Sequence, residues 1–157
     1  MSPARRSAGL LLHRDGPDGF EGWIAHMGGP FWAKKDERAW SIPKGELEPD
    51  ETDDLAVARR EFAEEMGVPA PDAAFASLGA FRYSSGKVVA VFAGAAPDFA
   101  PAEIRSNTFE IEWPPRSGRV QAFPEVDRAA WVPLPRAREL LVAGQVPALD
   151  ALVQTLA

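Results

Sequence analysis

The chain reads Gly45-Glu46-Leu47-Glu48-Pro49-Asp50-Glu51 and, after eight further residues, Arg60-Glu61-Phe62-Ala63-Glu64-Glu65-Met66-Gly67-Val68. The turn-forming and capping residues before Asp53 predict a helix over residues 52–66, which Gly67 ends. On this helix Glu61 and Glu65 lie four residues apart, so their side chains are neighbours and repel by about 0.2–0.5 kcal/mol. A divalent cation bound between them would reverse the sign of that interaction.

These carboxylates border the apolar stripe of the predicted helix. At about 100° per residue, Glu65 and Glu64 lie on either side of Glu61, and the stripe that includes Phe62 begins beside Glu65. Partly desolvated carboxylates need partners, and Mg²⁺ prefers carboxylate oxygens. The alternative is a surface helix in which Arg60 and Glu64 form an i,i+4 ion pair. The local pattern alone leaves the two interpretations open.

The same stretch resembles the Nudix box, the motif of a family of pyrophosphohydrolases, which reads G-x5-E-x7-R-E-U-x-E-E-x-G-U with U an apolar residue. The positions that match in type are Gly45, Glu51, Arg60, Glu61, Phe62, Glu64, Glu65, Gly67 and Val68. One spacing differs, because eight residues separate Glu51 from Arg60 where the motif has seven. The role of Glu51 therefore does not carry over directly, whereas the spacing within the glutamate cluster is intact.

The resemblance implies an α+β fold, a Nudix-like α/β/α sandwich with a mixed β-sheet, formed by residues 1–157 as a single Nudix domain. It also implies that Glu61, Glu64 and Glu65 hold Mg²⁺ (or Mn²⁺) and that one of them can act as a base. We favour Glu64 and Glu65 as ligands and Glu61 as ligand or base. Metal ions neutralise phosphate oxygens and lower the pKa of bound water, so a carboxylate cluster is a coherent site for hydrolysis of a phosphoanhydride.

Other segments resemble a bacterial Nudix subgroup described as predicted nucleoside-triphosphate pyrophosphohydrolases. They are residues 28–35, 106–118 and 123–131. In some Nudix enzymes a loop outside the box supplies a further ligand or base, and Glu125 is similarly placed here. Glu110 and Glu112 compete for that role, and a solvated turn residue is the alternative for Glu125.

Several residues, Gly45 among them, are candidates for binding a substrate. Lys44, directly before Gly45, would reach a phosphate, or else it faces solvent. Trp32 and Trp113 lie in or beside predicted loops, where an aromatic face can stack on a nucleobase. Arg116 is a candidate for a distal phosphate, with a surface arginine as the alternative.

Composition limits the classes of protein to which the chain can belong. A chain of 157 residues with 46% hydrophobic residues suffices for one buried core. The chain has no cysteine, which excludes disulfides and is compatible with a cytoplasmic location. Its net charge of −6 argues against polymeric nucleic acid as a partner and permits a small-molecule nucleotide if a metal offsets repulsion. No apolar run approaches the length of a membrane span.

Alternation and turn residues predict the remaining elements. We expect strands over residues 7–13, 22–27, 39–42, 76–83, 87–95, 108–113 and 128–132, and helices over residues 136–142 and 148–156. The first two strands form a hairpin, as do the strands on either side of Ser84-Ser85-Gly86. This order of strands and helices points to a sheet flanked by helices.

The leading functional prediction is a metal-dependent hydrolase of nucleoside diphosphate-linked compounds, with a nucleoside triphosphate or dinucleoside polyphosphate as substrate. An ADP-ribose or sugar-nucleotide pyrophosphatase is the alternative substrate class. A non-catalytic module that senses a nucleotide is the alternative from another class, and it would be expected to lack a box carboxylate. A purely structural acidic helix would show no strong effect of Mg²⁺ or Mn²⁺ on stability.

Overall fold

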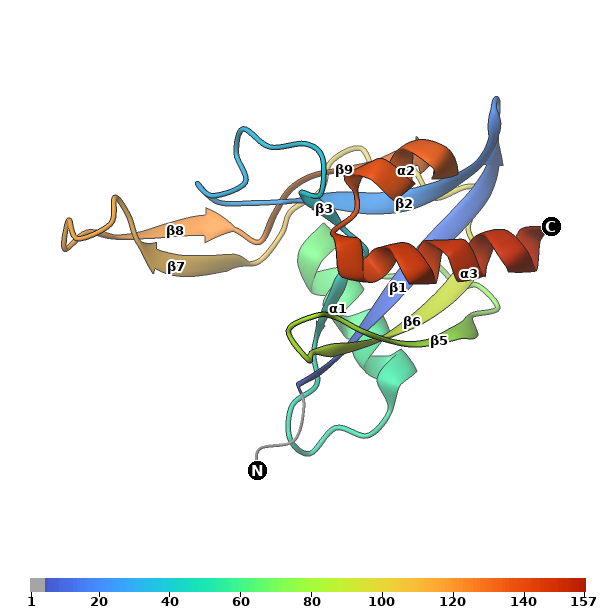
Figure 1. Ribbon diagram of the computed structural model, residues 1–157, viewed down its shortest axis with the longest axis horizontal. Helices are drawn as coiled ribbons and strands as arrows, with labels where there is room; N and C mark the ends of the chain where they lie inside the picture. The colour runs from blue at the N-terminus through green and yellow to red at the C-terminus, as the bar shows by residue number, and fades with distance from the viewer. Residues whose placement is uncertain (1–4) are drawn as a thin grey trace.

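The computed structural model describes residues 5–157 and is built on a mixed β-sheet with helices on both faces (Figure 1). The sheet contains seven strands: β1 (Arg6–Gly16), β2 (Gly19–Met27), β3 (Trp40–Ser41), β4 (Lys44–Glu46), β5 (Ala76–Arg82), β6 (Val88–Ala95) and β9 (Val126–Pro133). Strands β1 and β6 pair in parallel, and all the other pairings are antiparallel. The expected sandwich with a mixed sheet is confirmed.

Strand β1 shows why helices cover both faces. Its successive side chains point to opposite faces, as the two-residue period of a strand requires. Leu10 and Leu12 pack with Phe62 and Met66 of helix α1 (Asp54–Met66), whereas Leu11 packs on the other face. That second face is covered by helices α2 (Leu134–Leu140) and α3 (Val146–Leu156), joined by the 3₁₀ turn η1 (Ala143–Gln145).

Helix α1 begins two residues later than the sequence predicts. Asp53 is its N-cap, and the Asp53 carboxylate accepts a hydrogen bond from the Ala56 backbone N–H at 3.1 Å. Gly67 ends the helix as predicted, in the left-handed conformation (φ 76°) that glycine adopts without strain. The helix is continuous from Asp54 to Met66, so the longer spacing after Glu51 leaves the order of the Arg60–Glu65 side chains around it undisturbed.

The sheet forks between β1 and β2, and the fork admits the segment that leads to Gly45. The two strands pair only from His13 opposite Gly22 to their turn. Beyond that point β4 pairs with β1 and β3 pairs with β2. The insertion needs a glycine at position 9, because a Cβ there would lie 2.8 Å from the Pro43 carbonyl oxygen. The sequence predicts a loop where β4 forms, since a three-residue strand in a fork has no periodicity to detect.

Two further strands form an arm outside the main sheet. Strands β7 (Thr108–Glu112) and β8 (Val120–Pro124) pair only with each other, and Figure 1 shows them projecting from the body. Strand β8 is not predicted from the sequence, and the last strand begins two residues earlier than predicted. Both differences have one cause: β8 and β9 follow each other directly with Glu125 between them, so no turn signal separates them.

The expected C-terminal helices are present with earlier starts. Each begins with a proline in its first turn, Pro135 in α2 and Pro147 in α3, a position where a missing backbone N–H costs nothing. None of the helices in residues 5–157 is both long enough and apolar enough to cross a membrane.

Candidate active site

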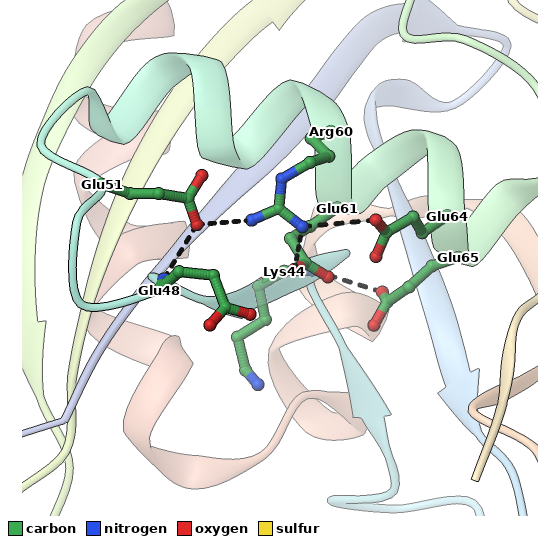
Figure 2. Close-up of polar contacts among 7 residues, drawn as sticks. All are labelled: Lys44, Glu48, Glu51, Arg60, Glu61, Glu64 and Glu65. Atoms are coloured by element: carbon green, nitrogen blue, oxygen red, sulfur yellow. Dashed lines mark hydrogen bonds and ion pairs between the residues drawn. The ribbon is translucent and has the colours of Figure 1, made fainter.

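Helix α1 presents three glutamates toward β4. Figure 2 shows Glu61, Glu64 and Glu65 on one side of the helix, with Arg60 between the carboxylates and the preceding loop. The adjacent side of the helix is buried, and Phe62 and Met66 are fully inaccessible to solvent. The carboxylates thus lie at the border of the apolar core, as the helical spacing predicts.

Arg60 neutralises part of this cluster. One guanidinium nitrogen lies 2.9 Å from a Glu61 oxygen and 3.2 Å from a Glu64 oxygen, and the other lies 2.8 Å from Glu51 (Figure 2). The Arg60–Glu64 ion pair of the surface-helix interpretation is therefore present, and so is the wider network. Glu51 joins the network despite its longer spacing from Arg60, and its carboxylate also accepts a hydrogen bond from the Glu48 backbone N–H at 2.8 Å.

Gly45 provides the space for Glu61. A Cβ at position 45 would lie 2.0 Å from the carboxyl carbon of Glu61, so any larger residue would displace that carboxylate. The Glu61 side chain is only 14% exposed. Burial, followed by repulsion from Glu64, raises the pKa of Glu61 above its ordinary value despite the opposing Arg60.

Glu65 is the most perturbed member of the cluster. The Lys44 backbone N–H donates a hydrogen bond to its carboxylate at 3.2 Å. Burial raises the pKa of Glu65 to about 8, Lys44 acts in the opposite direction, and the carboxylates of Glu125 and Glu61 add to the rise. A carboxylate that resists ionisation among other carboxylates is one that a bound cation would stabilise.

A cavity of about 600 Å³ opens over these groups. Among the residues that line it are Lys44, Gly45, Glu48, Glu61, Glu64, Glu65 and Glu125. Glu125 lies in the bend between β8 and β9, where its carbonyl accepts a hydrogen bond from the Gly28 N–H and its N–H donates to the Asn107 carbonyl, both at 2.9 Å. The competing candidates Glu110 and Glu112 lie on the arm and do not line the cavity.

A second cavity of about 350 Å³ lies beside the first. The two share Lys44, Glu65 and Glu125, and the second is also lined by Trp32 and Phe109. The structure thus brings Trp32 to the carboxylates together with an aromatic residue that the sequence analysis did not single out. Phe109 reaches this place because the base of the arm lies against Gly29, whose missing side chain leaves room for the Phe109 ring.

Two of the predicted substrate-binding residues are not brought to the cluster. Trp113 lies beyond the end of β7 and makes an edge contact with Phe31, with 5.3 Å between ring centroids. Arg116 lies in the turn of the arm, exposed, with a positive φ of 61°. Neither residue lines either of the two cavities.

The cavity also contains residues that the sequence analysis missed. They are Ser7, Glu46, Glu48, Tyr83, Ser85, Lys87, Val88, Val89 and Asn107. Most come from β1, β6 and the β5–β6 turn, which are adjacent because β1 pairs in parallel with β6. Parallel pairing between distant strands leaves no local signal in a sequence.

The donor set fits a hard divalent cation. The cavity is rich in carboxylate oxygens, and Gly45 keeps the space beside the Glu61 carboxyl group free of a side chain. Within residues 5–157 no three carboxylate or imidazole groups are already arranged as a metal shell. Arg60 instead binds oxygens of Glu61 and Glu64. The chemistry of the ligands is therefore appropriate, although the ligands are not preassembled around one point.

Comparison with protein families gives one match over most of the chain. The family model described as the NUDIX domain matches residues 5–152. No curated protein is similar enough in sequence to be counted as a relative.

Solved structures with the same fold include several proteins of this kind. A C. elegans Ap4A hydrolase binary complex is 19% identical with a TM-score of 0.68, over 96% of this chain and 97% of that chain. The NUDIX domain of Shewanella oneidensis NrtR complexed with ADP ribose is 14% identical with a TM-score of 0.68, over 100% and 91%. The MutT protein from Methanosarcina mazei Go1 is 17% identical with a TM-score of 0.61, over 99% and 96%. At these identities the likeness shows the fold alone.

Proposed function

The chain belongs to the Nudix family, and from that premise we propose that it is a pyrophosphohydrolase that uses Mg²⁺ or Mn²⁺ to hydrolyse a phosphoanhydride bond in a nucleoside diphosphate-linked compound. One observation carries this proposal: Glu61, Glu64, Glu65 and Glu125 line a single cavity beside Gly45. Arg60 offsets part of the desolvation and mutual repulsion of these four carboxylates, and a bound cation would offset the rest. A purely structural helix has no need to gather them.

In the proposed site Glu61, Glu64 and Glu65 would hold the metal. When bound, Mg²⁺ or Mn²⁺ supplies charge neutralisation for the phosphate oxygens and acidifies a coordinated water. Glu125 faces the same cavity from the β8–β9 bend, which suits a further ligand or a base that accepts a proton from the attacking water. Arg60 has a different role: its ion pairs with Glu51, Glu61 and Glu64 fix the orientation of the cluster.

The substrate would lie across both cavities. Lys44 lines each of them and is suited to bind a phosphate near the bond that is broken. Trp32 and Phe109 line the second cavity and offer aromatic faces for a nucleobase. These assignments favour a nucleoside triphosphate or a dinucleoside polyphosphate, with an ADP-ribose or sugar-nucleotide substrate as the alternative.

A nucleotide sensor that does not hydrolyse its ligand is the second candidate function. One structural neighbour is a NUDIX domain in complex with ADP ribose, which shows that this fold accommodates such a ligand. The present chain retains every acidic residue of the box, which is unnecessary for binding alone. This observation favours hydrolysis.

The test is incubation of the protein with a panel of nucleoside triphosphates, dinucleoside polyphosphates and sugar nucleotides, followed by identification of the products. We expect cleavage with Mg²⁺ or Mn²⁺ and none after chelation. Binding across the panel without any product would favour the sensor. Cleavage that is unaffected by chelation would refute the metal-dependent mechanism.

A further inference from the structure

Gln145 is a fully buried polar residue in η1 that lies outside the Nudix box and has a fixed orientation. Its side-chain oxygen accepts a hydrogen bond from the Ile42 backbone N–H at 2.7 Å. A backbone N–H can only donate, so the amide nitrogen must occupy the other position. That nitrogen donates to the Ser41 hydroxyl at 2.9 Å and to the Tyr83 hydroxyl at 2.8 Å.

This arrangement leaves Tyr83 as a hydrogen-bond donor. Its hydroxyl oxygen already accepts from Gln145, and within residues 5–157 no group accepts its proton. The ring is held in place by Gly144, where a Cβ would lie 2.3 Å from the Tyr83 ring. Burial raises the pKa of Tyr83, which keeps the hydroxyl protonated. Tyr83 is also one of the residues that line the larger cavity.

Two further donors belong to the same end of the cavity. Ser85 and Lys87 follow Tyr83 in the β5–β6 turn, and both line the larger cavity. Lys87 is exposed and forms no ion pair with any of residues 5–157. An ammonium group and two hydroxyl groups together suit a phosphate.

These donors lie away from the aromatic pocket. Tyr83, Ser85 and Lys87 line only the larger cavity, whereas Trp32 and Phe109 line only the smaller one. The residues that the two cavities share, including Glu65 and Glu125, lie between them. The end of the larger cavity that Tyr83, Ser85 and Lys87 line offers no aromatic face for a second base, because the Tyr83 ring is packed against Gly144.

We propose that Tyr83, Ser85 and Lys87 bind the terminal phosphate of a substrate that carries a single nucleobase, and that Gln145 is the positioning residue that directs the Tyr83 hydroxyl. This inference rests on the proposed function and narrows it to a nucleoside triphosphate. The base lies against Trp32, the scissile bond lies at the carboxylates, and the phosphate chain ends at Lys87.

Binding of a nucleoside triphosphate analogue with methylene bridges, which resists hydrolysis, tests the inference. Calorimetry in the presence of Mg²⁺ compares this analogue with the matching nucleoside monophosphate, which has no distal phosphate. We expect Lys87→Met to raise the Kd of the analogue about tenfold or more and Tyr83→Phe to raise it about fivefold, since bonds to charged groups are the stronger ones. The Kd of the monophosphate should change less than about twofold in either variant.

Arg82→Met is the matched control, because it removes a positive charge from the same hairpin at a position that does not line the cavity. It should leave both dissociation constants within about twofold. Equal weakening of both ligands by Lys87→Met, an effect of Arg82→Met as large as that of Lys87→Met, or tighter binding of a dinucleoside polyphosphate than of the analogue would overturn the proposal.

Gln145→Met tests the positioning role. The variant removes the amide donor at a similar side-chain length, so the Tyr83 hydroxyl loses its fixed orientation. The Kd of the analogue should rise no more than it does in Tyr83→Phe, and the double variant should be no weaker than Tyr83→Phe. Additive losses would refute the role of Gln145, and circular dichroism checks that each variant is folded. If the wild-type protein shows the expected binding pattern and hydrolyses nothing on the panel, the hydrolase proposal fails while this assignment stands.

Discussion

Helix α1 and the β7–β8 arm both carry residues that the sequence marks as functional, yet only the helix brings its residues together. Glu61, Glu64 and Glu65 are held by a helix packed on the main sheet, and they line one cavity. Trp113 and Arg116 lie on a two-stranded arm that pairs with nothing else. Residues of the site therefore come together where their element is held in place by the core.

The base of the arm is an informative exception. Phe109 lies where the arm contacts Gly29, and it lines the cavity beside Trp32. A two-stranded ribbon is only marginally stable alone, so its position is best defined where it leaves the main body. We therefore expect the effect of a substitution on activity to decrease along the arm, from Phe109 at its base toward Arg116 at its tip.

The largest effect is expected at the helix. Glu65→Gln keeps the size of the side chain and its place beside Lys44 but removes the charge that would hold a metal. Loss of a supporting partner of a metal ligand typically costs about 10–100-fold in activity, so loss of a ligand should cost at least about 100-fold in kcat. Steady-state kinetics with Mg²⁺ measures this loss, and thermal unfolding checks that the variant stays folded.

The matched control is Glu110→Gln, which makes the same chemical change on the arm. Glu110 is exposed on β7 and lines neither of the two cavities near the carboxylates. The kcat of Glu110→Gln should stay within about twofold of the wild-type value, as for most surface substitutions. Near wild-type activity of Glu65→Gln, or an equal loss in Glu110→Gln, would break the distinction between the two regions.

A second effect concerns the stability of the metal-free protein. The pKa of Glu65 is raised to about 8 in the folded state, from an ordinary value near 4.5. Between these values the folded state binds more protons than the unfolded state, so the contribution of Glu65 makes the free energy of unfolding fall as pH rises from 4.5 to 8. The groups that face Glu65 are Lys44 on β4, Glu61 on α1 and Glu125 in the β8–β9 bend.

Urea unfolding between pH 5 and pH 8 in the presence of a chelator measures this contribution. We expect the wild type to lose on the order of a few kcal/mol relative to Glu65→Gln over this range, because the variant cannot ionise there. His13 also contributes to the pH dependence, with the opposite sign, because burial lowers its pKa. That contribution is the same in the wild type and in Glu65→Gln, so the difference between their free energies of unfolding reports Glu65. Mg²⁺ should restore stability to the wild type at pH 8. Parallel pH profiles would contradict the assignment.

The sequence alone predicts the carboxylate face of helix α1 better than it predicts the rest of the cavity around it. Helical spacing is local, so the positions of Glu61, Glu64 and Glu65 relative to the apolar stripe followed from the order of residues. The match to the Nudix box added Gly45, and the structure explains that glycine by the space that Glu61 occupies.

The rest of the cavity depends on contacts between distant segments. Lys87 reaches it through the parallel pairing of β1 with β6, and Phe109 reaches it through the close approach of the arm to Gly29. Neither contact has a local periodicity that a sequence displays. The same reason explains the missed strands: β4 fills a fork in the sheet, and β8 follows its partner through a turn and leads directly into β9.

A moderate effect is expected in the aromatic pocket. Trp32→Ala removes one wall of the second cavity and leaves the carboxylates in place. Stacking of an aromatic side chain on a base is worth about 1–3 kcal/mol, so KM should rise about tenfold or more while kcat changes little. Measurement of both constants for a nucleoside triphosphate checks this split. A fall in kcat with unchanged KM would place Trp32 in the chemistry of the reaction instead of in base binding.

The smallest effects are expected at the end of the arm. Trp113→Ala removes an edge contact with Phe31, and Arg116→Ala removes an exposed charge in the turn. Both residues lie outside the two cavities that contain the carboxylates and Trp32, so kcat and KM should each stay within about twofold of wild type. A tenfold rise in KM in either variant would show that the arm folds over the bound substrate, because in the structure described here neither side chain reaches the cavity. That outcome would extend the site along the arm and would break the contrast with the helix.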